Sequence, residues 1–188
     1  ANIVFGGSTT PNEALTDKNE QWDGSSWSEV GDLSAAKNFV YQGGEGSSSA
    51  GLCFGGALPS KTTATEEWDF TSTLSAGAWA SGGNLGTARY MGGGAGTQTA
   101  ALLFGGATPG VTDVNESYDG SSWTEVGDLN TAKKNRGSAG TQTAALAFGG
   151  APYVAINELW DGSSWTEVGD LNSNKACAVG FGTSTAAL

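Results

Sequence analysis

Short apolar runs of three to five residues recur along the chain, and each ends in the block Phe-Gly-Gly before a polar loop begins. The block starts at Phe5, Phe54, Phe104 and Phe148. No window shows the 3.6-residue period of an amphipathic helix, and glycine is too frequent for helices to be stable. Runs of this length between turn residues are typical of strands. The pattern therefore predicts an all-β fold.

A second, more polar pattern follows each loop. It reads Glu-x-aromatic-Asp, with the glutamate and the aromatic residue two positions apart and so on one face of a strand. A turn then leads to a tryptophan at Trp27, Trp79, Trp123 and Trp165. Three of these turns contain Asp-Gly, the strongest short signal for a β-hairpin. In the other repeat, a nine-residue insertion over 70–78 follows Asp69.

The spacing of these patterns shows an internal repeat. Successive Phe-Gly-Gly blocks lie 49, 50 and 44 residues apart, and 45 residues remain from Phe148 around to Phe5. The chain thus holds four repeats of about 47 residues. Each repeat is expected to give four short strands, which for one unit are 89–96, 99–105, 114–119 and 122–126.

Taken together, the Phe-Gly-Gly run, Glu-x-aromatic-Asp, the tryptophan, a leucine and a basic residue resemble the kelch repeat, and the resemblance covers the whole chain. It implies a β-propeller with the glycine-rich strand innermost. Near-identical copies at 96–102 and 140–146, and at 119–130 and 161–172, are similar to repeats in structural proteins of marine bacteriophages. Kelch propellers usually have six or seven blades, so four repeats imply either a small ring or a larger ring built by two chains.

Composition favours the small ring. Glycine makes up 31 of 188 residues, and the small side chains of the inner strands allow four strands to crowd around a narrow axis. Residues 183–188 and 1–5 read as overlapping copies of one strand. We therefore predict a single domain over residues 1–188. It is a four-bladed β-propeller of four-stranded antiparallel blades, closed by pairing of the N- and C-terminal strands. The surplus residues 186–188 could instead pair with a neighbouring chain, so a homo-oligomer is an alternative.

The net charge of the chain limits the classes of partner that we expect. The chain has 8 basic and 19 acidic residues and no histidine, for a net charge of −11. Such a chain repels nucleic acid and anionic membranes, and it lacks the histidine of common triads and metal sites. No spacing typical of a calcium or phosphate loop occurs. We therefore expect no cofactor, no bound metal and no enzymatic activity.

The regular charges are expected to be structural. One glutamate and one base recur in every repeat, and we predict that they form ion pairs, since a glutamate beside a buried tryptophan needs compensation. The set is Glu20, Glu66, Glu116 and Glu158 with Lys37, Arg89, Lys133 and Lys175. The aspartate after each aromatic residue is expected to bond its own turn. Cys53 and Cys177 are interpreted as small buried apolar side chains, and two cysteines allow one disulfide at most.

Function is expected in what breaks the repeat. The loops after Phe-Gly-Gly run over 8–19, 57–65, 107–115 and 151–157 and should emerge on one face. Aromatic residues outside the pattern are candidate binding residues: Phe39, Tyr41, Phe70, Tyr90, Tyr153 and Phe181. We expect a binding or assembly module, on a virion surface or secreted, that contacts a glycan or a structural protein. The alternatives are a multivalent lectin and a self-assembling subunit joined through its terminal strands.

Overall fold

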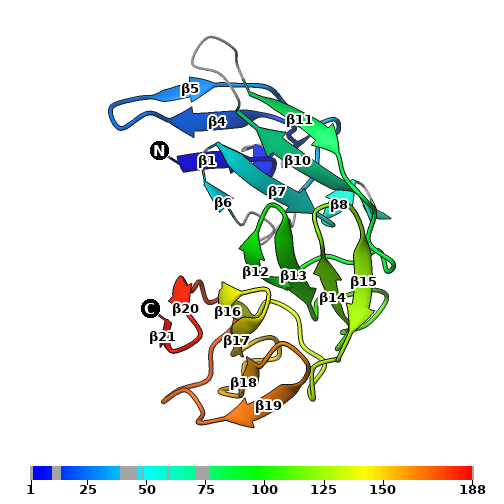
Figure 1. Cartoon of the computed structure of the whole chain (residues 1–188), viewed down its shortest axis with the longest axis vertical. Coiled ribbons are helices and arrows are strands. Elements are labelled where there is room, and N and C mark those ends of the chain that lie inside the picture. Colours follow the sequence, from blue (N-terminus) through cyan, green and yellow to red (C-terminus); the bar gives the residue numbers. More distant parts are fainter. Residues whose placement is uncertain are drawn as a thin grey trace.

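A computed structural model describes residues 2–9, 14–38, 46–47, 49–58, 60–70 and 77–187, and all regular structure within these ranges is β-strand. Four antiparallel sheets follow one another along the chain and are arranged as an arc (Figure 1). The prediction of an all-β chain of repeated antiparallel sheets is confirmed. The second, third and fourth sheets have four strands each, and the first has three.

The strands of each sheet, in spatial order, have the following bounds. The first sheet holds β1 (Asn2–Phe5), β4 (Asn19–Trp22) and β5 (Trp27–Glu29). The second holds β11 (Ala78–Ser81), β10 (Thr65–Asp69), β7 (Ala50–Phe54) and β6 (Gly46–Ser47). The third holds β12 (Gly93–Thr97), β13 (Ala100–Phe104), β14 (Asn115–Tyr118) and β15 (Trp123–Val126). The fourth holds β16 (Gly137–Thr141), β17 (Ala144–Phe148), β18 (Asn157–Trp160) and β19 (Trp165–Val168).

Three two-stranded ribbons complete the fold. Two of them lie in loops that follow Phe-Gly-Gly: β2 (Ser8–Thr9) with β3 (Ala14–Leu15), and β8 (Ala57–Leu58) with β9 (Ser60–Lys61). The third pairs β20 (Gly182–Thr183) with β21 (Ala186–Ala187) at the C-terminal end.

The strands of the third sheet begin and end within one residue of their predicted bounds, except at the start of the first strand. That strand begins at Gly93, four residues later than expected, because Arg89 lies in the connector from the preceding sheet and Met91 has a positive φ of 59°. The register places Gly94 opposite Leu103 and Leu103 opposite Glu116. A glycine on the inner strand thus leaves room for larger side chains on the second strand.

The Asp-Gly turns form as predicted. In the third sheet, Asp119 Oδ1 accepts hydrogen bonds from the backbone N–H groups of Ser121 and Ser122, at 2.9 and 2.8 Å. Gly120 adopts a φ of 94°, which favours glycine. The same contacts recur around Asp23 and Asp161. The aspartate therefore holds the hairpin.

The Phe-Gly-Gly block links each sheet to the next connector. The second glycine donates its N–H to the carbonyl of the repeated basic residue, as Gly106 does to Lys133 at 2.9 Å. The first glycine has a φ of 64°, and a Cβ on Gly105 would lie 2.6 Å from the same carbonyl oxygen. Only glycine fits this approach, which explains why the block is repeated.

The apolar core lies between neighbouring sheets. One cluster joins Leu52 and Phe54 of the second sheet to Tyr118 of the third, and another joins Phe104 of the third to Trp165 of the fourth. Each such contact between a sheet and the next one is called a junction below. Three junctions are formed along the arc.

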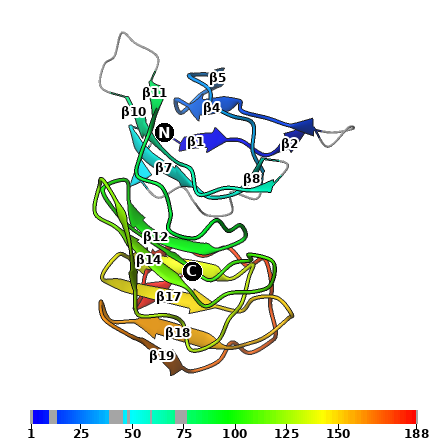
Figure 2. The same cartoon turned by 90° about the vertical axis from the view of Figure 1, so that its right-hand side faces the viewer.

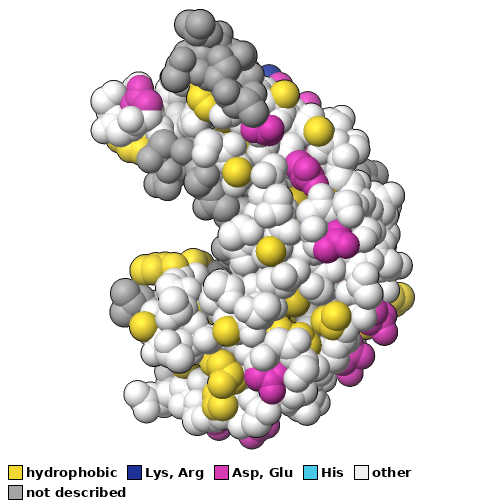
Figure 3. All heavy atoms as spheres, viewed as in Figure 1, with side chains coloured by type: hydrophobic (Ala, Val, Ile, Leu, Met, Phe, Trp, Pro, Cys, Tyr) yellow, Lys and Arg dark blue, Asp and Glu magenta, His cyan; other side chains and the backbone are white. Residues whose placement is uncertain are grey.

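The structure does not show the predicted ring closure. In the described residues β1 pairs with β4 and β20 pairs with β21, so the terminal strands do not pair with each other. The N- and C-terminal ends lie on opposite sides of a wide opening (Figure 1), which is also a notch in the molecular surface (Figure 3). The four sheets thus form an open arc.

Candidate functional site

Buried ion pairs join each connector to the sheet that it leads into. Lys37 Nζ lies 2.5 Å from Glu66 Oε1, and Arg89 Nη1 lies 2.5 Å from Glu116 Oε1, with all four side chains at most 3% exposed. The base belongs to one repeat and the glutamate to the next. Each of these two buried pairs therefore joins two successive repeats.

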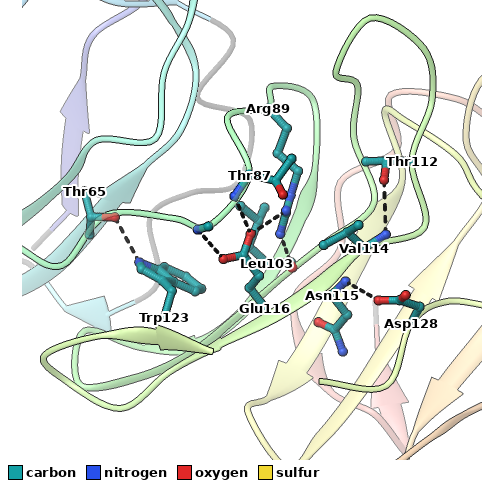
Figure 4. A network of polar contacts seen from close by, with 11 residues as sticks. Thr65, Thr87, Arg89, Leu103, Thr112, Val114, Asn115, Glu116, Trp123 and Asp128 are labelled. Atoms are coloured by element: carbon teal, nitrogen blue, oxygen red, sulfur yellow. Dashed lines mark hydrogen bonds and ion pairs between the residues drawn. The ribbon is translucent and has the colours of Figure 1, made fainter. Parts of the chain in front are cut away.

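Backbone N–H groups of the connectors also donate hydrogen bonds to these glutamates, as Figure 4 shows for Glu116. Gly86 donates its N–H to Glu116 Oε2 at 2.7 Å, and Ser34 donates in the same way to Glu66. Arg89 also donates to the carbonyl oxygen of Leu103 at 2.9 Å. Hydrogen bonds to both carboxylate oxygens offset the cost of burying the charge.

The third ion pair corrects the prediction for Lys133. Glu158 pairs with Arg136 instead, at 2.7 Å. Arg136 stands at the position of Gly92 in the preceding repeat, where a Cβ would lie 2.6 Å from the side chain of Leu103. Ala147 replaces that leucine in the fourth sheet, which leaves room for the arginine. The signal available in the sequence was an arginine three residues after the expected base.

Glu20 and Lys175, two described residues of the predicted set, form no ion pair with each other. Both residues are exposed, and among the ion pairs of the described residues none involves either one. Glu20 lies on β4 at the N-terminal end of the arc, and Lys175 lies in the connector before β20 at the other end. These two residues would belong to a fourth junction, which the open arc lacks.

The buried pairs alter the proton affinities of their members. Burial by itself would raise the pKa of Glu66, but hydrogen bonds from Lys37 and Ser34 bring that pKa below its ordinary value. Burial lowers the pKa of the Arg89 guanidinium, and Glu116 partly offsets this effect. Glu66 pairs with Lys37 and Arg89 pairs with Glu116, and each pair requires the charged form of both members. We therefore interpret Glu66 and Arg89 as structural residues rather than as acid–base groups.

Another polar contact crosses a junction. The Tyr118 hydroxyl donates a hydrogen bond to Glu67 of the neighbouring sheet. Burial and the adjacent carboxylate raise the pKa of Tyr118 to about 12. Trp123 donates from Nε1 to the hydroxyl of Thr65 at 2.9 Å across the same junction (Figure 4). Sequence patterns alone did not indicate either contact.

The loops after Phe-Gly-Gly emerge on one face of the arc, as predicted. Figure 2 shows the ribbons at β2 and β8 on the same side, opposite the side where β10 ends and β11 begins. The four loops differ in structure, because two contain ribbons, one has a turn closed by Thr108 and Gly110, and one contains the cis bond before Pro152. This face, over the described parts of 8–19, 57–65, 107–115 and 151–157, is called the loop face.

The candidate aromatic residues do not form one site. Tyr90 is half-buried and bridges through its backbone to Ala107 on the loop face, where Tyr153 is 74% exposed. Phe70 follows the last residue of β10 and so lies at the opposite face. Phe181 precedes β20 at the open end and is 64% exposed. Phe39 and Tyr41 lie outside the described residues.

The two cysteines are free. Cys53 is fully buried on β7, and burial raises the pKa of its thiol to about 12. Cys177 is exposed, which contradicts its interpretation as a buried apolar side chain. It has a positive φ of 55° in the connector before β20.

Comparisons and searches of the described residues add the following. No protein-family model matches the chain, and no curated protein matches it. Among the described residues, no group of three or more acidic or cysteine side chains is placed to hold a metal ion. No helix long and apolar enough for a membrane span occurs in that part of the chain either. The kelch and phage resemblances therefore rest on the repeat pattern alone.

Proposed function

We propose that this chain is a non-catalytic binding or assembly module whose sheets are the blades of a kelch-like β-propeller and whose loop face contacts a glycan or a structural protein. The observation that carries the proposal is the division between repeated and variable parts. Three of the four repeated aspartates are engaged in turns and three of the four repeated glutamates in ion pairs, whereas the loops on one face differ from sheet to sheet.

The chemistry of the loop face suits recognition by hydrogen bonding and apolar contact. Its exposed residues include Tyr153, and Val111 is 46% exposed in the third loop. An aromatic side chain beside hydroxyl and amide groups fits both a sugar ring and a protein surface. A net charge of −11 disfavours nucleic acid and anionic membranes as partners, and a virion surface or secretion suits a binding module of this kind.

A multivalent lectin is the alternative, and it requires equivalent pockets in several sheets. The four loops are unequal in length and in structure, which favours one composite surface over repeated pockets. A glycan array titrated with the chain separates the two, since repeated pockets give several equal sites per chain.

The test compares two single variants on a glycan array and against candidate structural proteins of the same particle. Tyr153→Ala removes an exposed aromatic side chain from the loop face and should abolish binding. Thr99→Ala changes an exposed residue at the opposite face and should leave binding intact. Equal binding by both variants would contradict a role for Tyr153 at the loop face. Catalytic turnover on glycans that Asp113→Asn abolishes would overturn the proposal as a whole.

A further inference from the structure

The two ends of the arc carry matching halves of the contacts that form each junction. At the three formed junctions, the phenylalanine of one sheet meets the tryptophan of the next sheet edge to face. The pairs are Phe5–Trp79, Phe54–Trp123 and Phe104–Trp165, with ring centroids 5.0, 5.1 and 4.8 Å apart. Among the described residues, the order of the repeats leaves Phe148 and Trp27 without such a partner.

Phe148 lines an open pocket of about 190 Å³ at the C-terminal end. Leu146 and Leu171 line it as well, together with Val179 and Ala187 of the C-terminal segment. Leu146 and Leu171 occupy the positions that Leu102 and Leu129 occupy in the preceding repeat. Those two leucines are buried in the cluster that holds Trp165. The pocket is therefore the place where the tryptophan of a following sheet would pack.

Trp27 is the corresponding tryptophan at the N-terminal end. It is 48% exposed, whereas its equivalent Trp165 is 5% exposed within a formed junction. Its one described ring contact is with Trp22 of its own sheet. A half-exposed indole at one end of the arc thus faces solvent while the pocket for an indole lies at the other end.

The charges of the two ends are also complementary. At formed junctions the residue after the repeated leucine donates its N–H to the glutamate of the next sheet, as Asn130 does to Glu158 at 2.7 Å. Asn172 and Lys175 occupy the donor and base positions at the C-terminal end, and Glu20 occupies the acceptor position at the N-terminal end. All three are exposed.

Close backbone packing gives a third match. A glycine after the outer strand of each sheet lies against the turn of the next sheet, so that a Cβ on Gly83 or Gly127 would meet a backbone carbonyl oxygen of Ser121 or Ser163. Gly169 is the equivalent residue in the last sheet, and a Cβ there would meet nothing within 4 Å. The equivalent of Ser163 in the first sheet is Ser25.

We propose that a second copy of this chain docks head to tail on these ends, with Trp27 and Glu20 of one copy on the Phe148 pocket and Lys175 of the other. With the three junctions formed as they are, the two ends of one chain lie across a wide opening (Figures 1 and 3). A second copy placed on these ends supplies the missing junction without bringing the two ends of one chain together. Two such contacts related by a twofold axis close the pair. The inference rests on the proposed assembly function and names its partner.

The experiment measures the mass of the full chain in solution by light scattering over micromolar to near-millimolar concentrations. We expect two chains per particle at the upper end. Gly169→Leu adds a side chain in open space and should leave one chain per particle with an unchanged melting temperature. Gly110→Leu adds the same side chain to another glycine with open space and should leave the pair intact.

A charge exchange tests the same contact from both sides. Glu20→Lys or Lys175→Glu alone should weaken pairing at least about tenfold, because like charges then meet in the contact. The double variant should recover most of the lost affinity. A one-chain mass at every concentration, including one with Trp27 shielded from solvent by ring closure within the chain, would overturn the proposal. So would a two-chain mass that Gly169→Leu leaves unchanged.

The outcome is separable from that of the proposed function. Tyr153 lies beside Val154, whose carbonyl oxygen accepts a hydrogen bond from the Lys175 N–H, whereas Val111 is on the loop face of the third sheet, away from both ends of the arc. Val111→Ala should therefore reduce ligand binding without changing the mass. Gly169→Leu should change the mass and leave each loop intact. Loss of pairing with retained ligand binding would overturn this inference alone.

Discussion

The ion pair of Arg89 and Glu116 is a buried residue-scale contact between the third sheet and the connector that leads into it. Glu116→Ala leaves a fully buried guanidinium whose remaining described contact is the Leu103 carbonyl. Because an unpaired buried charge is costly, we expect the free energy of unfolding to fall by about 3–5 kcal/mol. Urea unfolding of the variant and the parent chain measures this difference. Glu125→Ala, at an exposed position opposite Glu116, should change it by less than about 0.5 kcal/mol.

The two cysteines give a second residue-scale prediction. A thiol reagent should modify Cys177 within minutes and leave Cys53 unmodified in the native chain, since Cys53 is 0% exposed and the pKa of its thiol is raised to about 12. Mass spectrometry should show one modification per native chain and two after denaturation. Two modifications under native conditions would mean that β7 opens readily.

At the scale of the element, the Asp-Gly hairpins should make stability depend on pH. Hydrogen bonds from Ser122 and Ser121 lower the pKa of Asp119 to about 2 from an ordinary value of 3.8, and the same turn occurs around Asp23 and Asp161. A carboxylate with a lowered pKa contributes stability above its unfolded pKa and loses that contribution as the pH falls. The melting temperature should therefore drop between about pH 4 and pH 2.

A variant isolates this contribution. Asp119→Asn keeps an oxygen acceptor in the turn but does not titrate, so its melting temperature should fall less steeply over the same interval than that of the parent chain. Parallel curves for the two proteins would show that the turn carboxylate contributes nothing to the acid sensitivity.

The elements themselves were largely predictable, because local chemistry determines them. The Asp-Gly turn requires a positive φ at Gly120, and the Phe-Gly-Gly block requires one at Gly105. Glycines at these positions therefore mark the ends of the strands in the sequence. The ion pairs were predicted as a set but wrongly at Lys133. The choice of Arg136 depends on the space left by Ala147 on a neighbouring strand, and a single repeat does not reveal such space.

The contacts between sheets were less predictable for the same reason. The bond from Tyr118 to Glu67 joins residues 51 positions apart and follows from the docking of two sheets. The candidate aromatic residues were chosen because they interrupt the repeat. That criterion does not indicate at which face of the arc each residue lies. Phe70 and Tyr153 consequently lie at opposite faces.

At the scale of the whole molecule, the curvature of the arc decides how many sheets a closed ring holds. The small residues of the inner strands allow the sheets to approach closely, and this favoured four blades. Curvature, however, is set by the junctions, where Phe104, Trp165 and Leu129 are packed between sheets. These side chains hold neighbouring sheets at an angle that leaves the ends apart. Inner-strand composition permits a small ring but does not impose one.

The charge of the molecule leads to a last prediction about pairing. Each chain carries a net charge of −11, so two copies repel each other at long range, whereas the proposed contact between Glu20 and Lys175 would be short-ranged and buried. Added salt screens the long-range repulsion more than the buried pair. Pairing should therefore strengthen as sodium chloride rises from low to physiological concentration, as sedimentation equilibrium would show. Gly169→Leu should stay a single chain throughout. Pairing that weakens over this range would mean that exposed ion pairs, rather than Trp27 and the Phe148 pocket, hold the two copies together.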